Sequence, residues 1–286
     1  MNKTQLIQFL RANEIWAKRT MGQNFLIDDE VLKKIITAAD IKSSDTVLEI
    51  GPGLGVLTGE LAKKAGKVIG VEKDDKLAEM LRGKFSNTNV KILNQDALEF
   101  DPSDLGNYKL VANIPYNITS LIIRKFLEAE NKPGLMVLMV QKEVAERIVA
   151  RPRSTGSGQA GDMSLLAISV QFYADAEIVE IVKNTSFFPV PKVDSAIIKL
   201  STIICQLSAD EEKSFFRIVK FGFAAKRKTL ENNLSSGMHI TKGETADIIR
   251  RAGLDEKIRA QDLSVEDWIS LYRHFGLDPE SSIKRS

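Results

Sequence analysis

Thr46-Val-Leu-Glu-Ile-Gly-Pro-Gly-Leu-Gly55 is the segment from which the architecture of this chain is predicted. Its first five residues are typical of a buried strand, its glycines form a turn, and residues 57–64 have the apolar spacing of a helix. A strand, a glycine turn and a helix open the βαβ unit that binds nucleotides, because the helix N-terminus presents N–H groups to a ligand. The segment therefore predicts an α/β fold with a nucleotide-type ligand.

Further predicted strands continue this pattern, at residues 67–71, 90–94, 109–113 and 135–140, with a helix at 142–150. Glu72 follows the first of these strands, and its carboxylate can accept both hydroxyls of a ribose. Asp96 follows the next strand and can receive an adenine amino group. Ligands of open α/β sheets lie outside the carboxyl ends of the strands, so we expect both acids in one site.

The glycine spacing leaves the cofactor open. A dinucleotide fingerprint, G-x-G-x-x-G, needs its third glycine where the helix meets the strand. Here the glycines stand at positions 51, 53, 55 and 59, and an acid, Glu49, precedes them inside the strand. This pattern fits S-adenosylmethionine at least as well as NAD.

The strand at 109–113 runs into Asn113-Ile-Pro-Tyr116. Pro115 ends the strand ladder and restricts φ, which predicts a rigid turn at the carboxyl end of the strand. The amide of Asn113 can accept a hydrogen bond from an amino group, and the ring of Tyr116 can stack on a base. The alternative is a β-turn in which the asparagine caps the backbone and the tyrosine packs.

Composition excludes several classes of protein. The chain has 286 residues, 43% of them hydrophobic, and a formal net charge of +2, so any basic surface must be local. Its single cysteine, Cys205, excludes an intramolecular disulfide and favours a reducing cytoplasm. The two histidines, His239 and His274, argue against a His/Cys metal centre or a Ser-His-Asp triad. The first residues of the sequence lack the apolar h-region typical of a signal peptide, and no apolar run is long enough to span a bilayer.

The middle of the chain is less regular. Residues 151–161, rich in Arg, Gly and Ser, predict a mobile loop, and residues 163–173 are ambiguous between helix and strand. Strands are predicted at 177–182 and 196–200. The segment between them contains Phe187-Phe-Pro-Val-Pro-Lys-Val-Asp-Ser195, in which a phenylalanine is either a hydrophobic anchor or a second stacking face opposite Tyr116.

A composition shift at residues 201–207 predicts two domains, 1–203 and 204–286, of which the second is small and helical. Three capping boxes open its helices: Ser208 with Glu211, Thr241 with Glu244, and Ser264 with Asp267. Between residues 213 and 230 there are basic residues and no acids. On one helix, five of them would share roughly one third of the circumference: Lys213, Arg217, Lys220, Arg227 and Lys228. This face is either solvated or contacts phosphates.

Five motifs in this order resemble the ribosomal RNA adenine-N6 dimethyltransferase family, above all its bacterial branch that acts on small-subunit (16S) RNA. They are Met21-Gly-Gln-Asn-Phe-Leu26, Glu49-Ile-Gly-Pro-Gly-Leu-Gly55, Asn113-Ile-Pro-Tyr116, the segment 187–195, and Lys226-Arg-Lys-Thr-Leu-Glu-Asn-Asn-Leu234. The resemblance covers residues 4–275. The loop at 151–162 departs from the pattern of the family, being longer and richer in Gly and Ser.

The resemblance implies a Rossmann-like methyltransferase domain followed by a helical RNA-binding domain. It implies S-adenosylmethionine-dependent dimethylation of N6 on two adjacent adenosines near the 3′ end of 16S RNA, and a role in ribosome biogenesis. The expected partner is the small (30S) subunit or its precursor, and we expect a cytoplasmic monomer without metal. Carried over by position, the cofactor residues are Asn24, Leu26, Gly51, Glu72, Asp96 and Asn113. Asn113, Tyr116 and Phe187 would hold the target adenine.

Without the resemblance, Gln23 and Asn24 are interpreted as part of a polar loop.

Three other functions stay open. A relative that methylates large-subunit RNA is disfavoured by the basic segment 226–234. A non-catalytic RNA-binding assembly or transcription factor is disfavoured by the retained Asn113 and Tyr116. An NAD-dependent oxidoreductase would need an acid such as a pocket His or Lys, which the sequence does not offer.

Overall fold

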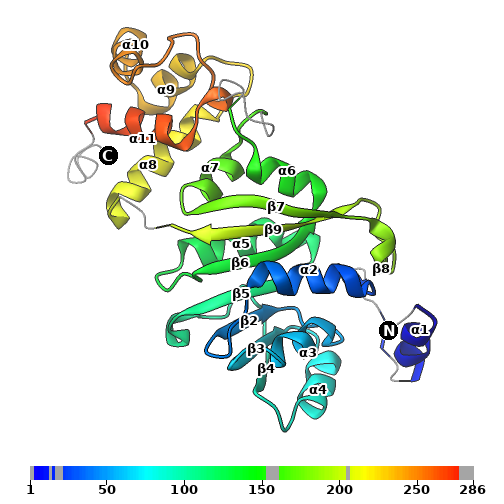
Figure 1. Cartoon of the computed structure of the whole chain (residues 1–286). Helices are drawn as coiled ribbons and strands as arrows, with labels where there is room; N and C mark the ends of the chain where they lie inside the picture. Colours follow the sequence, from blue (N-terminus) through cyan, green and yellow to red (C-terminus); the bar gives the residue numbers. More distant parts are fainter. Residues whose placement is uncertain (1–2, 13–14, 17–21, 153–160, 204–206, 277–286) are drawn as a thin grey trace. The chain divides into compact units, whose positions relative to one another are not determined.

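The chain forms two compact units, Met1–Ala145 with Ala174–Thr202, and Glu146–Tyr173 with Ile203–Ser286. A computed structural model describes residues 3–12, 15–16, 22–152, 161–203 and 207–276 (Figure 1). Most of the predicted loop at 151–161, Met21 of the first motif, and Cys205 lie outside the described residues.

The first unit is built on a seven-stranded sheet in the order β4-β3-β2-β5-β6-β9-β7. The strands are β2 Thr46–Ile50, β3 Lys67–Glu72, β4 Val90–Asn94, β5 Tyr108–Asn113, β6 Leu135–Gln141, β7 Ala174–Val182 and β9 Ser195–Thr202. The first five are parallel, and β9 runs antiparallel between β6 and β7. All seven predicted strands are present. The strand order reverses between β2 and β5, which is where such sheets bind ligands.

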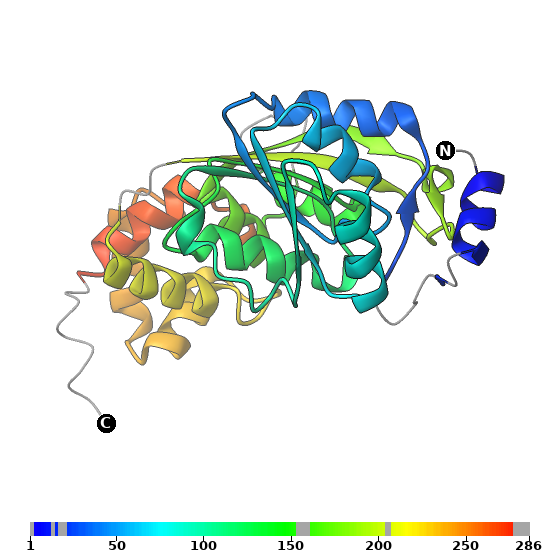
Figure 2. The ribbon, with the colours of Figure 1, turned by 90° about the horizontal axis from the view of Figure 1, so that it is seen from below.

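Helices cover this sheet, and their ends follow from the sequence. They are α2 Asp29–Ala39, α3 Val56–Ala62, α4 Asp75–Lys84 and α5 Thr119–Glu128. The carboxylate of Asp28 caps α2 by accepting from the backbone N–H groups of Glu30 and Val31. Figure 2 shows α2 lying along one face of the sheet, where Ile35 and Ile36 enter the core.

A short two-stranded ribbon brings the N-terminal segment onto this unit. Strand β1, Phe25–Leu26, pairs antiparallel with β8, Phe187–Phe188. Helix α1, Lys3–Ala12, joins it through an apolar cluster, whose buried members are Leu6, Leu10, Ile15, Phe25, Leu54 and Leu77. Because Leu54 belongs to the glycine turn, this cluster ties the N-terminal segment to the turn.

The second unit is helical. Helix α6, Lys142–Val149, leads into it, and it contains α7 Leu165–Gln171, α8 Ala209–Gly222, α9 Leu230–Met238, α10 Lys242–Arg251 and α11 Val265–His274. The ambiguous segment 163–173 therefore contains a helix, α7. All three predicted capping boxes are present at the starts of α8, α10 and α11. The predicted fold class, α/β with a helical C-terminal part, is confirmed. None of the described helices has the length and apolar character needed to cross a membrane.

The prediction of one helix across residues 213–230 is wrong. Helix α8 ends at Gly222, and a new helix starts at Leu230. The side-chain amide of Asn233 donates to the carbonyl oxygens of Gly222 (2.6 Å) and Ala225 (3.1 Å), which satisfies backbone groups that a continuing helix would use. Arg227 and Lys228 therefore lie in the connection between α8 and α9 and do not share a helix face with Lys213, Arg217 and Lys220.

Residues 146–173 group with the C-terminal helices, whereas the sequence predicted one boundary between residues 203 and 204. Aromatic packing explains this grouping. The ring of Phe172 stacks on that of Phe215 with centroids 4.6 Å apart, and Tyr173 stacks on Phe216 at 5.9 Å. Such pairs stabilise beyond the area that they bury, so the end of α7 packs with α8 although about 40 residues separate them in sequence.

Candidate active site

A cavity of about 420 Å³ lies at the carboxyl ends of β2, β3 and β5, beside the point where the strand order reverses. Six segments line it: residues 22–26, 49–54, 56–57, 71–73, 96–97 and 113–118. The structure thus brings together Asn24, Leu26, Gly51, Glu72, Asp96, Asn113 and Tyr116, which were predicted from separate motifs. A volume of this size is typical of a small-molecule site.

The glycine turn forms one wall of this cavity. Gly51, Gly53 and Gly55 have φ of 67°, 59° and 71°, a left-handed conformation in which a side chain would be strained. A Cβ on Gly55 would also collide with Leu81 and Phe85. Gly55 is the N-cap of α3 and has no side chain to cap the helix. The backbone can therefore approach a ligand closely and present N–H groups to it.

Glu72 is held in one orientation by the backbone. Its Oε2 accepts from the Gly53 N–H at 3.0 Å, and its Oε1 accepts from the Asp74 N–H at 2.9 Å. Burial raises the pKa of Glu72 above its ordinary value, and these two bonds oppose that shift. Each carboxylate oxygen keeps a second lone pair, so the group can still accept two ligand hydroxyls.

Asp96 is already engaged at both oxygens. Its Oδ2 lies 2.7 Å from Nζ of Lys73, and its Oδ1 accepts from the Leu98 N–H at 2.8 Å. The Lys73 hydrogen bond, followed by the Leu98 bond, lowers the pKa of Asp96, so this carboxylate stays charged. Because Lys73 is largely exposed, its bond to Asp96 costs little to exchange for a ligand amino group.

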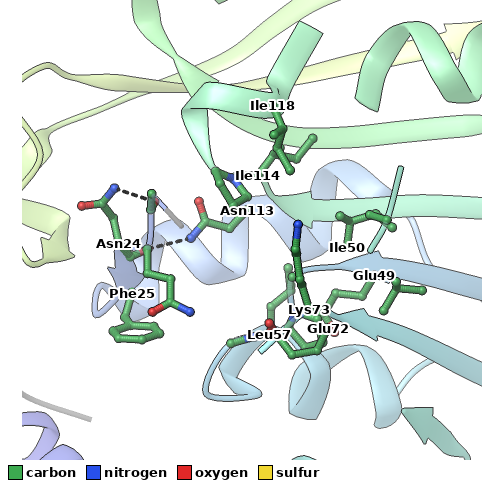
Figure 3. A pocket seen from close by; sticks show the side chains of 18 of the residues that line it. Asn24, Phe25, Glu49, Ile50, Leu57, Glu72, Lys73, Asn113, Ile114 and Ile118 are labelled. Atoms are coloured by element: carbon green, nitrogen blue, oxygen red, sulfur yellow. Dashed lines mark hydrogen bonds between the residues drawn. The ribbon is translucent and has the colours of Figure 1, made fainter. Parts of the chain in front are cut away.

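Asn113 is oriented by the N-terminal segment (Figure 3). Its Nδ2 donates to the backbone carbonyl of Asn24 at 3.1 Å, and Asn24 in turn donates to the carbonyl of Gly22 at 3.2 Å. Both residues line the cavity. Because the amide nitrogen is occupied, Oδ1 of Asn113 remains as an acceptor for a ligand amino group.

Tyr116 lies at the start of a single 3-10 turn, Tyr116–Ile118, directly after Pro115. Its phenol lies 2.7 Å from Oγ of Ser195 at the start of β9. Burial raises the pKa of Tyr116, so at neutral pH the side chain is an uncharged phenol. The ring lines the cavity and can offer a face to a planar base.

Phe187 is not brought into the cavity wall. Its side chain is 1% exposed and belongs to the core cluster that contains Val31, Ile35 and Met139. The reason is the pairing of β8 with β1, which sets Phe187 opposite Leu26. A buried ring has no free face, so the prediction that Phe187 stacks on a base is not met in this conformation.

The predicted RNA-contact residues belong to the second unit, and only some of them are available. Lys213 pairs with Asp210 at 2.9 Å, and Arg217 is half-buried with its Nε inaccessible. Lys220, Arg227 and Lys228 are exposed, and no ion pair engages them within the described part of the chain. These three are the basic side chains of the predicted set best placed to meet phosphates.

Glu49, the acid that precedes the glycine turn inside β2, also belongs to the site, although the sequence did not predict it as a site residue. It lines the cavity, is 1% exposed, and its Oε2 has no hydrogen-bond partner within the described residues. Burial raises the pKa of Glu49 to about 8; Thr58 and Lys84 oppose this shift, and the charge of Glu72 adds to it. At neutral pH the free protein therefore holds Glu49 mainly protonated.

This shift predicts a pH-dependent stability. The folded state binds the Glu49 proton up to about pH 8, whereas the unfolded chain releases it near 4.5. The contribution of Glu49 to the free energy of unfolding is therefore greatest below pH 4.5 and is lost as the pH rises through 8. Glu49→Gln removes the dependence, so urea unfolding should show the variant gaining stability relative to wild type between pH 5 and pH 9. If the difference in unfolding free energy between the variant and wild type stays constant over this pH range, the raised pKa of Glu49 is contradicted. Glu79→Gln, at an exposed site, is the control.

Comparison with known proteins adds independent findings. The family model described as ribosomal RNA adenine dimethylase matches residues 16–276. A protein of Dehalococcoides mccartyi named ribosomal RNA small subunit methyltransferase A is 46% identical over 270 residues, covering 92% of this chain and 90% of that protein. A protein of the same name from Clostridioides difficile is 40% identical, covering 87% and 88%.

Solved structures of similar fold include two methyltransferases. A dimethyladenosine transferase from Plasmodium falciparum superposes with a TM-score of 0.72 at 30% identity, covering 88% of this chain and 97% of that one. The 23S rRNA methyltransferase ErmE also has a TM-score of 0.72, at 29% identity, covering 89% and 100%. Within the described residues, no group of three His, Cys, Asp or Glu side chains could hold a metal ion.

Proposed function

The chain belongs to the ribosomal RNA adenine dimethylase family, and from this we propose that it dimethylates N6 of two adjacent adenosines near the 3′ end of 16S rRNA. It is an rRNA adenine dimethyltransferase with a Rossmann-like fold, and its methyl donor is S-adenosylmethionine. The observation that carries the proposal is the convergence of Glu72, Asp96, Asn113 and Tyr116 in one cavity. We further propose that the enzyme acts as a monomer in the cytoplasm, on the small subunit or its precursor.

The cavity fits S-adenosylmethionine, which supplies an electrophilic methyl group on a sulfonium centre. We assign the ribose to Glu72, whose two oxygens are already oriented by backbone N–H groups. We assign the adenine amino group of the donor to Asp96. Asn24, Leu26, Gly51 and Asn113 complete the binding set, and the left-handed glycines let the backbone approach.

The acceptor amine of adenine is a poor nucleophile, because its lone pair is delocalised into the ring. Oδ1 of Asn113, together with the carbonyl of Ile114, can accept the amino hydrogens and favour a more tetrahedral nitrogen. The carbonyl of Asn24 keeps the amide in the orientation this requires. Catalysis on this account is positioning and electrostatics supplied by groups that are already oriented.

The target base must leave its stack to enter the cavity, which costs a few kcal/mol. Stacking on the ring of Tyr116, worth about 1–3 kcal/mol per base, offsets much of that cost. Tyr116 lines the cavity, whereas Phe187 is buried in the core and does not line it.

A methylation assay on separated, unmodified ribosomal subunits tests the proposal. We expect dimethyladenosine in the RNA of the small subunit and none in that of the large subunit. Methylation of the large subunit alone would favour the second candidate, a 23S-type activity, which the likeness to ErmE keeps open.

Glu72→Ala should weaken S-adenosylmethionine binding by roughly 1–3 kcal/mol, because a charged hydrogen-bonding partner is lost. The donor should raise the melting temperature of the wild type through preferential binding to the folded state, and NAD should not. Isothermal titration calorimetry measures the affinity, with Glu79→Ala on the exposed face of α4 as the control. Unchanged affinity in the Glu72 variant would remove this residue from the site.

We propose that residues 204–286 contact the RNA through the exposed Lys220, Arg227 and Lys228. Phosphate contacts position a protein on a nucleic acid, and neutralising phosphates releases counterions. Replacing all three with Ala should weaken binding to the small subunit and flatten its dependence on salt, with donor affinity unchanged. Binding measured at several salt concentrations gives the slope. The control variant replaces three exposed lysines near the amino end of β3, away from the cavity: Lys63, Lys64 and Lys67. If the two triple variants bind the small subunit alike, then Lys220, Arg227 and Lys228 do not contact the RNA.

A further inference from the structure

A buried serine far from the cavity-lining motifs in sequence holds the ring of Tyr116. The phenol oxygen lies 2.7 Å from Oγ of Ser195, and the two residues are 79 positions apart in the chain. Ser195 is 0% exposed and is not itself among the residues that line the cavity. It therefore reaches a ligand only through Tyr116.

The backbone around Ser195 is fixed from both sides. Ser195 begins β9, where it pairs with Gln141 of β6 and Val182 of β7. The preceding residue, Asp194, accepts from the Lys142 N–H through its carbonyl at 3.0 Å and from the Asn184 N–H through its carboxylate at 3.0 Å. The backbone therefore holds the hydroxyl of Ser195 in one place, and this hydroxyl can fix the position of the Tyr116 phenol.

Tyr116 needs such a point because its own segment is short. It sits on a single 3-10 turn, and its hydroxyl has no other hydrogen bond within the described residues. Without that bond, the ring keeps its place in the wall but can tilt. An adenine that stacks on Tyr116 takes the plane of the ring. A tilted ring would therefore turn N6 of the adenine away from the methyl group of the donor.

We infer that Ser195 is a positioning residue for methyl transfer, which fixes the plane of the Tyr116 ring against which the acceptor adenine stacks. The inference rests on the proposed function. The second transfer depends on this alignment more than the first, because a nitrogen that already carries a methyl group has one remaining hydrogen to present to Asn113 and fewer productive orientations.

Three variants test this inference: Ser195→Ala, Tyr116→Phe and the double variant. Each single change removes the same hydrogen bond, so each should lower kcat by about 3- to 10-fold, the equivalent of one hydrogen bond. The KM for S-adenosylmethionine should stay unchanged, and the share of monomethyladenosine in the product should rise. The double variant should be no slower than the slower single variant, because the bond can be lost only once.

The readouts are steady-state kinetics on the small subunit and mass spectrometry of the digested RNA. Tyr116→Phe leaves β9 intact, so it tests the bond even if Ser195→Ala fails to fold. Ser186→Ala is the matched control, since it removes another buried serine hydroxyl of the same unit, bonded to Asp28 at 2.8 Å. It should lower the melting temperature without changing the ratio of the two products.

Wild-type product ratios in both single variants, or multiplied losses in the double variant, would overturn the role of Ser195. A wild type that does not methylate the small subunit would instead overturn the proposed function. The two failures are therefore distinguishable in one set of assays.

Discussion

Asn113→Ala should lower the rate of methyl transfer by on the order of 10²-fold or more, the scale seen when one positioned polar group is removed from a site. The variant loses the Oδ1 acceptor for the adenine amine. It also loses the Nδ2 bond to the carbonyl of Asn24, which helps to hold the N-terminal segment at the cavity. Donor affinity is therefore expected to fall as well.

Single-turnover kinetics at saturating S-adenosylmethionine separate these two losses. If Asn113 only held Asn24 in place, the rate would recover once the donor saturates the enzyme. We expect that it does not recover, because the acceptor oxygen is still missing. Asn107→Ala, at an exposed asparagine just before β5, is the matched control and should leave the rate unchanged. A saturated Asn113→Ala rate near that of wild type would exclude the catalytic role.

Tyr116→Ala should lower kcat/KM for the RNA by about 10- to 100-fold, because stacking worth about 1–3 kcal/mol per base is lost. Tyr116→Phe keeps the ring and loses only the bond to Ser195, so its effect should be several times smaller. The phenylalanine variant is thus the matched control for the alanine variant.

Kinetics on small subunits with both variants check this prediction, and calorimetry with S-adenosylmethionine checks that the donor site is intact. Equal damage from the two substitutions would mean that the phenol, and not the ring face, serves the reaction. Since burial raises the pKa of Tyr116, the phenol carries no charge at neutral pH, and we do not expect that outcome.

Local sequence signals were sufficient for most of the fold. The seven strands of the sheet followed from apolar runs, and the three capping boxes followed from residues three positions apart. The carboxyl ends of the strands also predicted where Glu72, Asp96 and Asn113 would meet. In a parallel sheet these ends share one edge, so strand order is enough to gather residues from distant motifs.

What local signals could not determine depends on contacts between segments far apart in the chain. The amide of Asn233 binds the carbonyl of Gly222 at the end of α8, pairing with β1 buries Phe187, and Ser195 meets Tyr116 across 79 positions. No periodicity or spacing records these contacts, because each depends on how separate elements pack. The sequence by itself thus determined the α/β fold and the residues at the strand ends, whereas the tertiary structure decided which side chains face the ligand, which are buried, and which hold them in place.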